Sequence, residues 1–184
     1  RALFVAMDLT PIAIDAWSPA ASCDGQGEAD AAWWRSVDHD AAHKALLDRL
    51  ERHGLSSLCE VIRASSSDAP VPQDIDLLHV DGNHAGQALR DVERFAPQVR
   101  IGGMLVLDDV SWYGGHVARG RDAAERLGFN VRVIRPILDE NALCLRHGRQ
   151  RRLTEADFVR LQTLLRPECP SSPISVATTL KGRR

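Results

Sequence analysis

Ile75-Asp76-Leu77-Leu78-His79-Val80-Asp81-Gly82-Asn83-His84 and Gly102-Gly103-Met104-Leu105-Val106-Leu107-Asp108-Asp109-Val110-Ser111-Trp112 are the two stretches that decide the fold. Each contains a short apolar run that ends at carboxylates. Runs of this length bounded by glycine are typical of buried strands in a parallel sheet. In an open α/β sheet, ligands bind at the carboxyl ends of the strands. We therefore expect Asp81, Asp108 and Asp109 to converge at one edge of a sheet.

The composition is that of an ordinary globular domain. The chain has 184 residues, of which 44% are hydrophobic and 26% charged, which fits one domain with a sizeable core. The net charge is −2 with both signs interspersed, so no basic face is available to follow a phosphate backbone. Nucleic acid is therefore not an expected partner. No run of about 18 apolar residues occurs, so no membrane span is predicted.

The cysteines give the expected compartment. Cys23, Cys59, Cys144 and Cys169 lie far apart, with no C-x-x-C pair and no metal-finger spacing. This usage is most consistent with a reduced, cytoplasmic location.

Strand and helix patterns alternate along the chain. We expect strands at residues 11–17, 58–63, 75–81, 104–108, 131–134 and 142–145, and helices at residues 38–53, from about 84, at 116–127 and from 154. Residues 18–35 are expected to form a long loop, which in a compact domain is typical of a lid or a mobile segment. Together these elements predict an α/β doubly wound domain that ends in an antiparallel hairpin.

The order of these motifs resembles that of class I S-adenosylmethionine-dependent methyltransferases. Ile14-Asp15-Ala16-Trp17, the Asp81-Gly82-Asn83-His84 motif and the run that ends at Asp108-Asp109 are similar to those of small-molecule O-methyltransferases with an Asp-Gly-x-His strand end. The chain is also similar to metal-dependent catechol and caffeoyl-CoA type enzymes, in which a Trp closely follows the acidic pair, as Trp112 does here. The resemblance covers roughly residues 11–145.

The resemblance implies a Rossmann-like sheet and the transfer of a methyl group to a hydroxyl of a small molecule. The implied cofactors are S-adenosylmethionine and Mg²⁺ or another hard divalent cation. The expected partner is a hydroxylated small molecule, with neither nucleic acid nor membrane, and a homo-oligomer is left open.

One part of the family pattern is absent, namely the first strand and its glycine-rich turn. Gly102-Gly103 precedes a strand rather than opening a helix, so it is not a phosphate loop. By resemblance, residues 1–8 are the end of the helix after that turn. We therefore expect an N-terminally truncated piece that binds cofactor poorly or not at all. Residues 1–166 would be the partial methyltransferase domain, and residues 167–184 a Pro/Ser-rich, basic, disordered tail.

The residues expected at the cofactor are Asp15, Trp17, Ser65, Ser66 and Asp81. An acid at the position of Asp15 can accept hydrogen bonds from both ribose hydroxyls of an adenosine, or it can be a cap or a solvated turn acid. Ser65 and Ser66 follow the strand where the family contacts adenine, although serine-rich turns also arise for local reasons. Trp17 either packs on the adenosine or covers the edge of the sheet.

Asp81, Asp108 and Asp109 are the expected metal ligands. Carboxylates held close together raise one another's pKa unless a cation compensates them. Three hard oxygen ligands favour Mg²⁺, Mn²⁺ or Ca²⁺ over zinc. By resemblance Asp81 and Asp108 bind the ion directly, and Asp109 binds it or supports a ligand. The alternative is that Asp81 caps a helix and Asp109 caps a turn.

His84 is the expected catalytic residue. In the related enzymes a basic residue three positions after the acid takes the proton of the acceptor hydroxyl, and histidine titrates in the right range. The alternative is a histidine in the first turn of a helix without a catalytic role. His79 lies within the strand, in the core or beside the cofactor, and no role is assigned to it.

Two other functions remain open on the sequence alone. An NAD(P)-dependent dehydrogenase would need G-x-G-x-x-G after its first strand, which this chain does not show, and would leave Asp108-Asp109 unexplained. A degenerate methyltransferase-like module without catalytic activity would explain the missing glycine-rich turn, but not the retained acids and His84.

Overall fold

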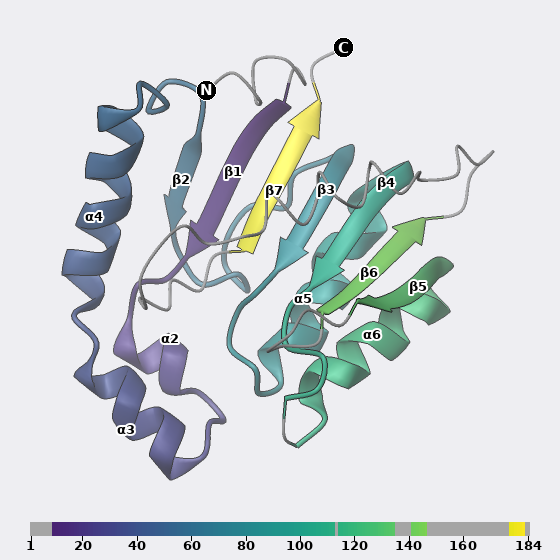
Figure 1. Ribbon diagram of the computed structural model, residues 1–184, viewed down its shortest axis with the longest axis horizontal. Coiled ribbons are helices and arrows are strands. Elements are labelled where there is room, and N and C mark those ends of the chain that lie inside the picture. Colours follow the sequence, from purple (N-terminus) through teal and green to yellow (C-terminus); the bar gives the residue numbers. More distant parts are fainter. Residues whose placement is uncertain (1–8, 113, 135–140, 147–176, 183–184) are drawn as a thin grey trace.

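The computed structural model describes residues 9–112, 114–134, 141–146 and 177–182. The strands are β1 (Leu9–Asp15), β2 (Glu60–Arg63), β3 (Ile75–Val80), β4 (Val99–Leu107), β5 (Phe129–Ile134), β6 (Asn141–Arg146) and β7 (Ala177–Gly182). The helices are α2 (Pro19–Cys23), α3 (Glu28–Ser36), α4 (His39–Arg52), α5 (Gln87–Phe95), the 3₁₀-helix η1 (Ala96–Gln98) and α6 (His116–Arg126). All seven strands form one sheet in the order β2-β1-β7-β3-β4-β6-β5 (Figure 1).

The direction of the strands brings four carboxyl ends to one edge of the sheet. β1 and β2 are parallel, as are β3 and β4. Because β7 is antiparallel to both β1 and β3, the two parallel pairs run the same way. β5 and β6 form the expected antiparallel hairpin, and β6 pairs with β4. The α/β class predicted from the sequence is confirmed.

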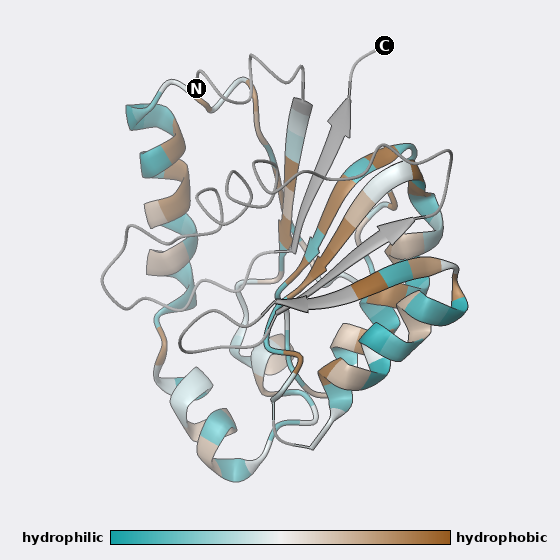
Figure 2. Cartoon of the chain, turned by 45° about the vertical axis from the view of Figure 1, so that its right-hand side comes forward, coloured by the Kyte–Doolittle hydropathy of each residue, from teal (hydrophilic) through white to brown (hydrophobic). Residues whose placement is uncertain are grey.

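The core lies between β3, β4 and the helices α5 and α6. Its largest fully buried side chains are Ile75, Leu78, Val92, Val99, Leu105, Leu107 and Val117. Gly120 brings the two helices close, because a Cβ there would lie 3.4 Å from the Ala88 carbonyl oxygen. Figure 2 shows the hydrophobic residues concentrated along the strands. This core fixes the ends of β3 and β4 relative to each other.

Helix α4 confirms one sequence prediction, and helices α2 and α3 correct another. α4 begins after Asp38, whose carboxylate accepts a hydrogen bond from the Ala41 amide at 2.9 Å, as an N-cap does. The long loop expected at residues 18–35 is wrong, since α2 and most of α3 lie there. Glu28 lies in the first turn of α3 and Arg35 in the last, which complements the helix dipole. The glycines around this short helix obscured its pattern.

Two element boundaries also differ from expectation. Asn83 accepts a hydrogen bond from the Ala85 amide at 2.8 Å in a turn, so α5 begins at Gln87 rather than at about residue 84. β4 begins at Val99, so the strand passes through Gly102 and Gly103 instead of starting after them. A shift of the β3–β4 register between Ile75 and Leu77 accompanies this glycine pair.

β7 lies within the tail that the sequence analysis placed at residues 167–184. Its backbone pairs with β1 on one side and β3 on the other, in the middle of the sheet (Figure 1).

Some of the predictions fall outside the described residues. These are the helix expected from residue 154, the segment 1–8 and most of the tail, so the domain boundaries stay a prediction. Among the described helices, α5 and α6 contact each other and the strands, while α4 lies beside β2 in Figure 1. The doubly wound arrangement stays a prediction. None of the described helices could span a bilayer.

Candidate functional site

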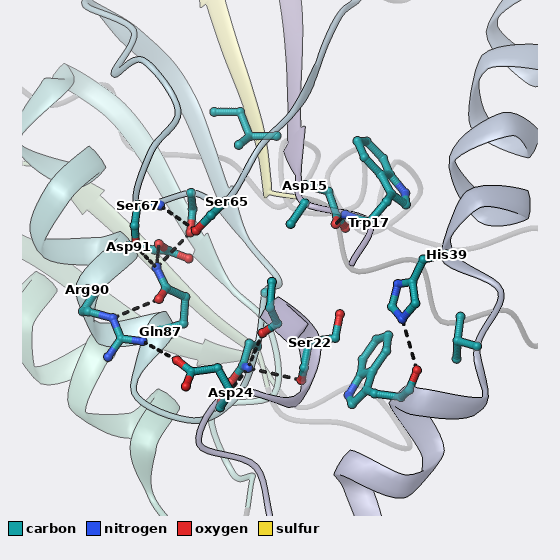
Figure 3. A pocket seen from close by; sticks show the side chains of 18 of the residues that line it. Asp15, Trp17, Ser22, Asp24, His39, Ser65, Ser67, Gln87, Arg90 and Asp91 are labelled. Atoms are coloured by element: carbon teal, nitrogen blue, oxygen red, sulfur yellow. Dashed lines mark hydrogen bonds and ion pairs between the residues drawn. The ribbon is translucent and has the colours of Figure 1, made fainter. Parts of the chain in front are cut away.

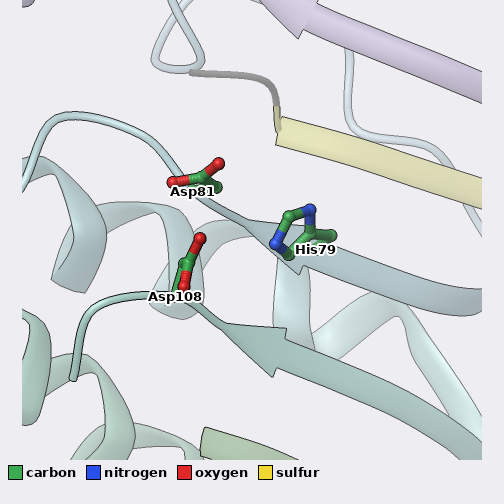
Figure 4. A group of neighbouring side chains, drawn as sticks. All are labelled: His79, Asp81 and Asp108. Carbon is green, nitrogen blue, oxygen red and sulfur yellow. The ribbon is translucent and has the colours of Figure 1, made fainter. Parts of the chain in front are cut away.

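The parallel pairing of β3 and β4 creates a cluster of polar side chains at the carboxyl edge. Val80 pairs with Leu107, and the Asp108 amide donates to the Val80 carbonyl oxygen at 3.1 Å, so Asp81 follows β3 beside Asp108. Side chains alternate along a strand, so His79 and Asp81 share one face. One ligand atom each from His79, Asp81 and Asp108 lies within 4.8 Å of the others (Figure 4).

Burial and neighbouring charges shift the pKa values of Asp81 and His79 in this cluster. Burial, the charges of Asp108 and Asp109 and a hydrogen bond with Asp108 raise the pKa of Asp81 to about 8. Burial lowers the pKa of His79, against the charge of Asp108. Without a cation, Asp81 therefore holds a proton at neutral pH. Two carboxylates and an imidazole nitrogen are also suitable ligands for a divalent metal ion, so the donor set fits one.

Asp109, the third expected ligand, faces His84. Its Oδ2 lies 3.5 Å from His84 Nε2, and Asp81 Oδ1 lies 4.0 Å from the same nitrogen. Asp109 has a φ of 50°, a left-handed conformation that is uncommon outside glycine and turns its backbone away from the line of β4. The structure thus brings all three acids to one edge, but only Asp81 and Asp108 lie in the cluster with His79.

His84 lies in a partly enclosed environment at the start of the turn before α5. Its side chain is 18% exposed, and its ring centroid lies 4.7 Å from that of Trp112. Nε2 is buried and makes no hydrogen bond of suitable geometry within the described residues. Burial lowers the pKa of His84, against the charges of Asp108 and Asp30. The imidazole is therefore neutral at pH 7 and able to accept a proton.

A cavity of about 390 Å³ lies at the same edge of the sheet, and Figure 3 shows side chains that line it. The end of β1 contributes Asp15 and Trp17 to its lining, and the turn after β2 contributes Ser65 and Ser66. Gly82 and Asn83, which directly follow Asp81, line it too. Four of the five expected cofactor residues therefore share one cavity, and Asp81 lies next to the lining rather than in it.

Asp15 and Trp17 are held by a tight turn at the end of β1. The Trp17 amide donates to Asp15 Oδ1 at 2.6 Å, and Trp17 has a φ of 41°. Burial raises the pKa of Asp15 to about 6, and this hydrogen bond and the charges of His39 and Arg63 oppose the rise. The indole packs on His43 with ring centroids 4.4 Å apart, and its buried Nε1 has no partner within the described residues.

Sequence reasoning missed the three cavity residues on α5, which are Gln87, Arg90 and Asp91. Gln87 Nε2 donates to Ser66 Oγ at 2.9 Å and to Asp91 Oδ1 at 2.7 Å. Asp91 is 2% exposed, and burial raises its pKa against the hydrogen bonds from Ser66 and Gln87. The sequence does contain a signal for this pair, because Asp91 lies on the apolar face of the expected helix, four residues after Gln87.

Asn83 was quoted as part of a motif, but its structural role was also missed. Its Nδ2 lies 3.0 Å from the carbonyl oxygen of Ala21, 3.2 Å from that of Ser22 and 2.8 Å from that of Asp24. Gln26 donates to Asn83 Oδ1 at 3.2 Å. The Asp-Gly-x-His motif therefore holds the α2 segment against the cavity.

Residues 17–110, just over half of the chain, match a family described as a methyltransferase domain. The chain belongs to this methyltransferase family. The matched segment contains the expected cofactor residues Trp17, Ser65, Ser66 and Asp81, and it ends just beyond Asp109.

Solved structures agree with the fold of this methyltransferase domain. The O-methyltransferase TomG from Streptomyces achromogenes, which is involved in tomaymycin synthesis and was solved with SAM, is 16% identical with a TM-score of 0.51. The alignment covers 80% of this chain and 77% of TomG. A candidate O-methyltransferase from Klebsiella pneumoniae is 12% identical with a TM-score of 0.52, over 80% of this chain and 77% of its own. A search of curated proteins gave no match. At these identities the likeness supports the fold alone.

Proposed function

We propose that this methyltransferase domain transfers a methyl group from S-adenosylmethionine to a hydroxyl group of a small molecule, with a divalent metal ion at the strand ends. The observation that carries the proposal is that Asp15 lines a cavity whose lining also includes Gly82 and Asn83, the two residues between Asp81 and His84. A donor site and a site for proton removal are thus next to each other. TomG, a structural neighbour with the same fold, was solved with SAM.

The cavity residues fit an adenosine-containing cofactor. A volume of about 390 Å³ lies within the range of small-molecule sites. The ionised carboxylate of Asp15 would accept hydrogen bonds from ribose hydroxyls, and Ser65 and Ser66 would contact the adenine. The indole Nε1 of Trp17, which has no hydrogen-bond partner among the residues that the structure describes, would be a donor for a ligand. Bound S-adenosylmethionine supplies the sulfonium methyl group.

Asp81 and Asp108 would hold the metal ion, in agreement with the donor set described above. Such an ion lowers the pKa of a hydroxyl group that it binds. Asp109 is close enough to His84 to orient its ring, which is the role that the geometry favours over direct metal binding. Asp109 would therefore orient His84 rather than bind the ion.

His84 would remove the proton of the acceptor hydroxyl. It is partly buried and neutral at pH 7, and the nearby carboxyl groups of Asp81 and Asp109 would stabilise the imidazolium that forms when it accepts the proton. Trp112 packs on the ring and excludes water from one side. The reactants are then held in fixed orientation, which accounts for much of the rate in a direct methyl transfer.

A methyl-transfer screen tests the proposal. The chain, extended at its N-terminus with the strand and glycine-rich turn of the family pattern, is incubated with isotopically labelled S-adenosylmethionine and pooled hydroxylated metabolites. Labelled products are found by mass spectrometry. We expect an O-methylated product that His84→Gln reduces on the order of a hundredfold or more, with unchanged binding of S-adenosylhomocysteine. His53→Gln, an exposed histidine after α4, is the matched control.

The other functions predict different results. A non-catalytic module would bind S-adenosylhomocysteine without any labelled product from the pools. A dehydrogenase would be stabilised by NAD(P) instead, which a thermal-shift measurement detects. Membership of a methyltransferase family favours the transferase over the dehydrogenase.

A further inference from the structure

We propose that His79 is the third protein ligand of the metal site, beside Asp81 and Asp108, and that this donor set selects a transition-metal ion of the Mn²⁺, Fe²⁺ or Co²⁺ type over Mg²⁺. The inference rests on the metal site of the proposed function. It adds the identity of the third ligand and the class of the ion. A set of three carboxylates would instead favour a hard cation such as Mg²⁺.

The backbone dictates that His79 belongs to this cluster. His79 lies two residues before Asp81, so the alternation of β3 places both side chains on one face of the sheet. His79 also pairs with Val106, which lies two residues before Asp108. Parallel pairing therefore directs all three side chains to the same side, and Figure 4 shows the imidazole beside the two carboxyl groups.

The distances fit a shared ion. The ligand atoms of the three residues lie within 4.8 Å of one another. Two protein atoms bound to one ion at about 2.0 to 2.2 Å can be at most roughly 4.4 Å apart, so small side-chain rotations complete the site. Asp109 offers no equal alternative, because its Oδ2 faces His84 Nε2 at 3.5 Å.

The chemistry of the donors determines the ion. Imidazole nitrogen binds later transition metals well and is a poor ligand for Mg²⁺ and Ca²⁺, which prefer oxygen. Two carboxylates with one imidazole form a mixed nitrogen and oxygen set with room for further ligands. His84 Nε2 lies 4.0 Å from Asp81 Oδ1, so a hydroxyl group held by this donor set would lie within reach of His84.

Metal titration of the tag-free chain tests the assignment. Isothermal titration with Co²⁺ and with Mg²⁺ is carried out on the wild type, His79→Gln, Asp109→Asn and Asp108→Asn. We expect His79→Gln to weaken Co²⁺ binding about tenfold or more while Mg²⁺ binding changes by less than about threefold. Asp108→Asn should weaken both ions, and the exposed control His53→Gln should weaken neither. Unchanged Co²⁺ binding in His79→Gln, or a loss in Asp109→Asn alone, overturns the assignment.

A spectroscopic measurement avoids dependence on the folding of His79→Gln. In the Co²⁺-loaded wild type, an imidazole ligand gives a strongly shifted ring N–H proton signal that disappears in D₂O. The signal should persist in His84→Gln, and its absence from the wild type contradicts the proposal. S-adenosylhomocysteine binding and methyl transfer are followed in parallel. If His79→Gln binds Co²⁺ normally while S-adenosylhomocysteine binding and methyl transfer persist, only the metal assignment is rejected. If the wild type shows no Co²⁺ binding, no S-adenosylhomocysteine binding and no methyl transfer, the proposed function is rejected as well.

Discussion

Asp15 connects the fold to ligand binding through a single carboxyl group. It ends β1, accepts the Trp17 amide at 2.6 Å and lines the cavity. Burial raises its pKa to about 6, so its charge changes within an accessible pH range. The ionised form offers both of its oxygens as acceptors to ribose hydroxyls, whereas protonation turns one of them into a donor.

We expect the affinity for S-adenosylhomocysteine to rise as the pH rises through the pKa of Asp15. Between about pH 5 and about pH 7.5 the increase should be roughly tenfold, because the ionised fraction grows by that factor. Isothermal titration at several pH values measures it. Asp15→Asn should bind more weakly with a flat profile, and an equal slope in this variant would assign the pH dependence to another group.

The raised pKa of Asp15 affects the stability of the ligand-free protein in the opposite direction from the ligand affinity. The pKa of Asp15 is higher in the folded protein than its ordinary value of 3.8, so the folded state binds more protons between the two values. The contribution of Asp15 to the free energy of unfolding therefore falls as the pH rises from about 4 to about 6. Urea unfolding of the ligand-free protein should show this decrease, and Asp15→Asn should reduce it.

The acids of the site could be predicted from sequence, but their partners could not. Strand ends with adjacent carboxylates predicted that Asp81 and Asp108 would meet, and they do. The left-handed backbone of Asp109 directs it to His84, and a local conformation of that kind has no signal in the pattern of apolar residues. His79 was assigned no role because a histidine within a strand is usually a core residue.

At the scale of elements, Asn83 ties the α2 segment to the end of β3. Three carbonyl oxygens of that segment lie within hydrogen-bond distance of its Nδ2. We expect Asn83→Ala to lower the free energy of unfolding by about 1 to 3 kcal/mol, since these carbonyls lose their donor. Affinity for S-adenosylhomocysteine should fall with it, because Ala21, Ser22 and Asp24 line the cavity. Chemical denaturation and calorimetric binding measure the two effects, and unchanged affinity would show that the segment does not shape the site.

Gly103 fixes the irregular part of β4. A Cβ at this position would lie 2.8 Å from Val99 Cγ1 and 2.9 Å from the Arg100 carbonyl oxygen. We expect Gly103→Ala to destabilise the protein by about 1 to 3 kcal/mol, because the backbone has to move. Gly86→Ala is the matched control, since its Cβ would meet only the flexible end of Arg90 at 3.0 Å. Urea unfolding compares the two, and equal stability would contradict the packing argument.

The elements with a clear period were predicted well and the short ones were not. α4 and the hairpin of β5 and β6 were confirmed, because apolar spacing and turn residues agree there. α2 and α3 were read as loop, since small and polar residues near Gly25 and Gly27 resemble turn sequences. The segment of α2 and the turn after it contact Asn83, which lies about sixty residues further on, and a local sequence pattern does not show such a contact.

At the scale of the whole molecule, β7 links two halves of the sheet. β1 and β2 form one half, and β3 to β6 form the other, with β7 between them. Residue Thr179 pairs with Ile12 on one side and Leu78 on the other. This strand was not predicted, because its neighbours in space are more than ninety residues away and its composition resembles a tail.

We expect Thr179→Pro to lower the free energy of unfolding by about 3 kcal/mol or more. Proline removes an amide that pairs within a central strand, and its ring disturbs the neighbouring pairs. Thr179→Val keeps the amide and is the control. Chemical denaturation monitored by circular dichroism compares the two variants. A stability of Thr179→Pro equal to that of Thr179→Val would show that β7 contributes little to the sheet.

The central place of β7 also has a consequence for the order of folding. The ribosome synthesises β1 early and β7 after all other described strands, so the middle of the sheet is the last part to become available. Until then β1 and β3 each present an unpaired edge, and such edges promote association between nascent chains. The large separation in sequence between β7 and its partner strands predicts slow refolding, with a late phase in which the two halves join.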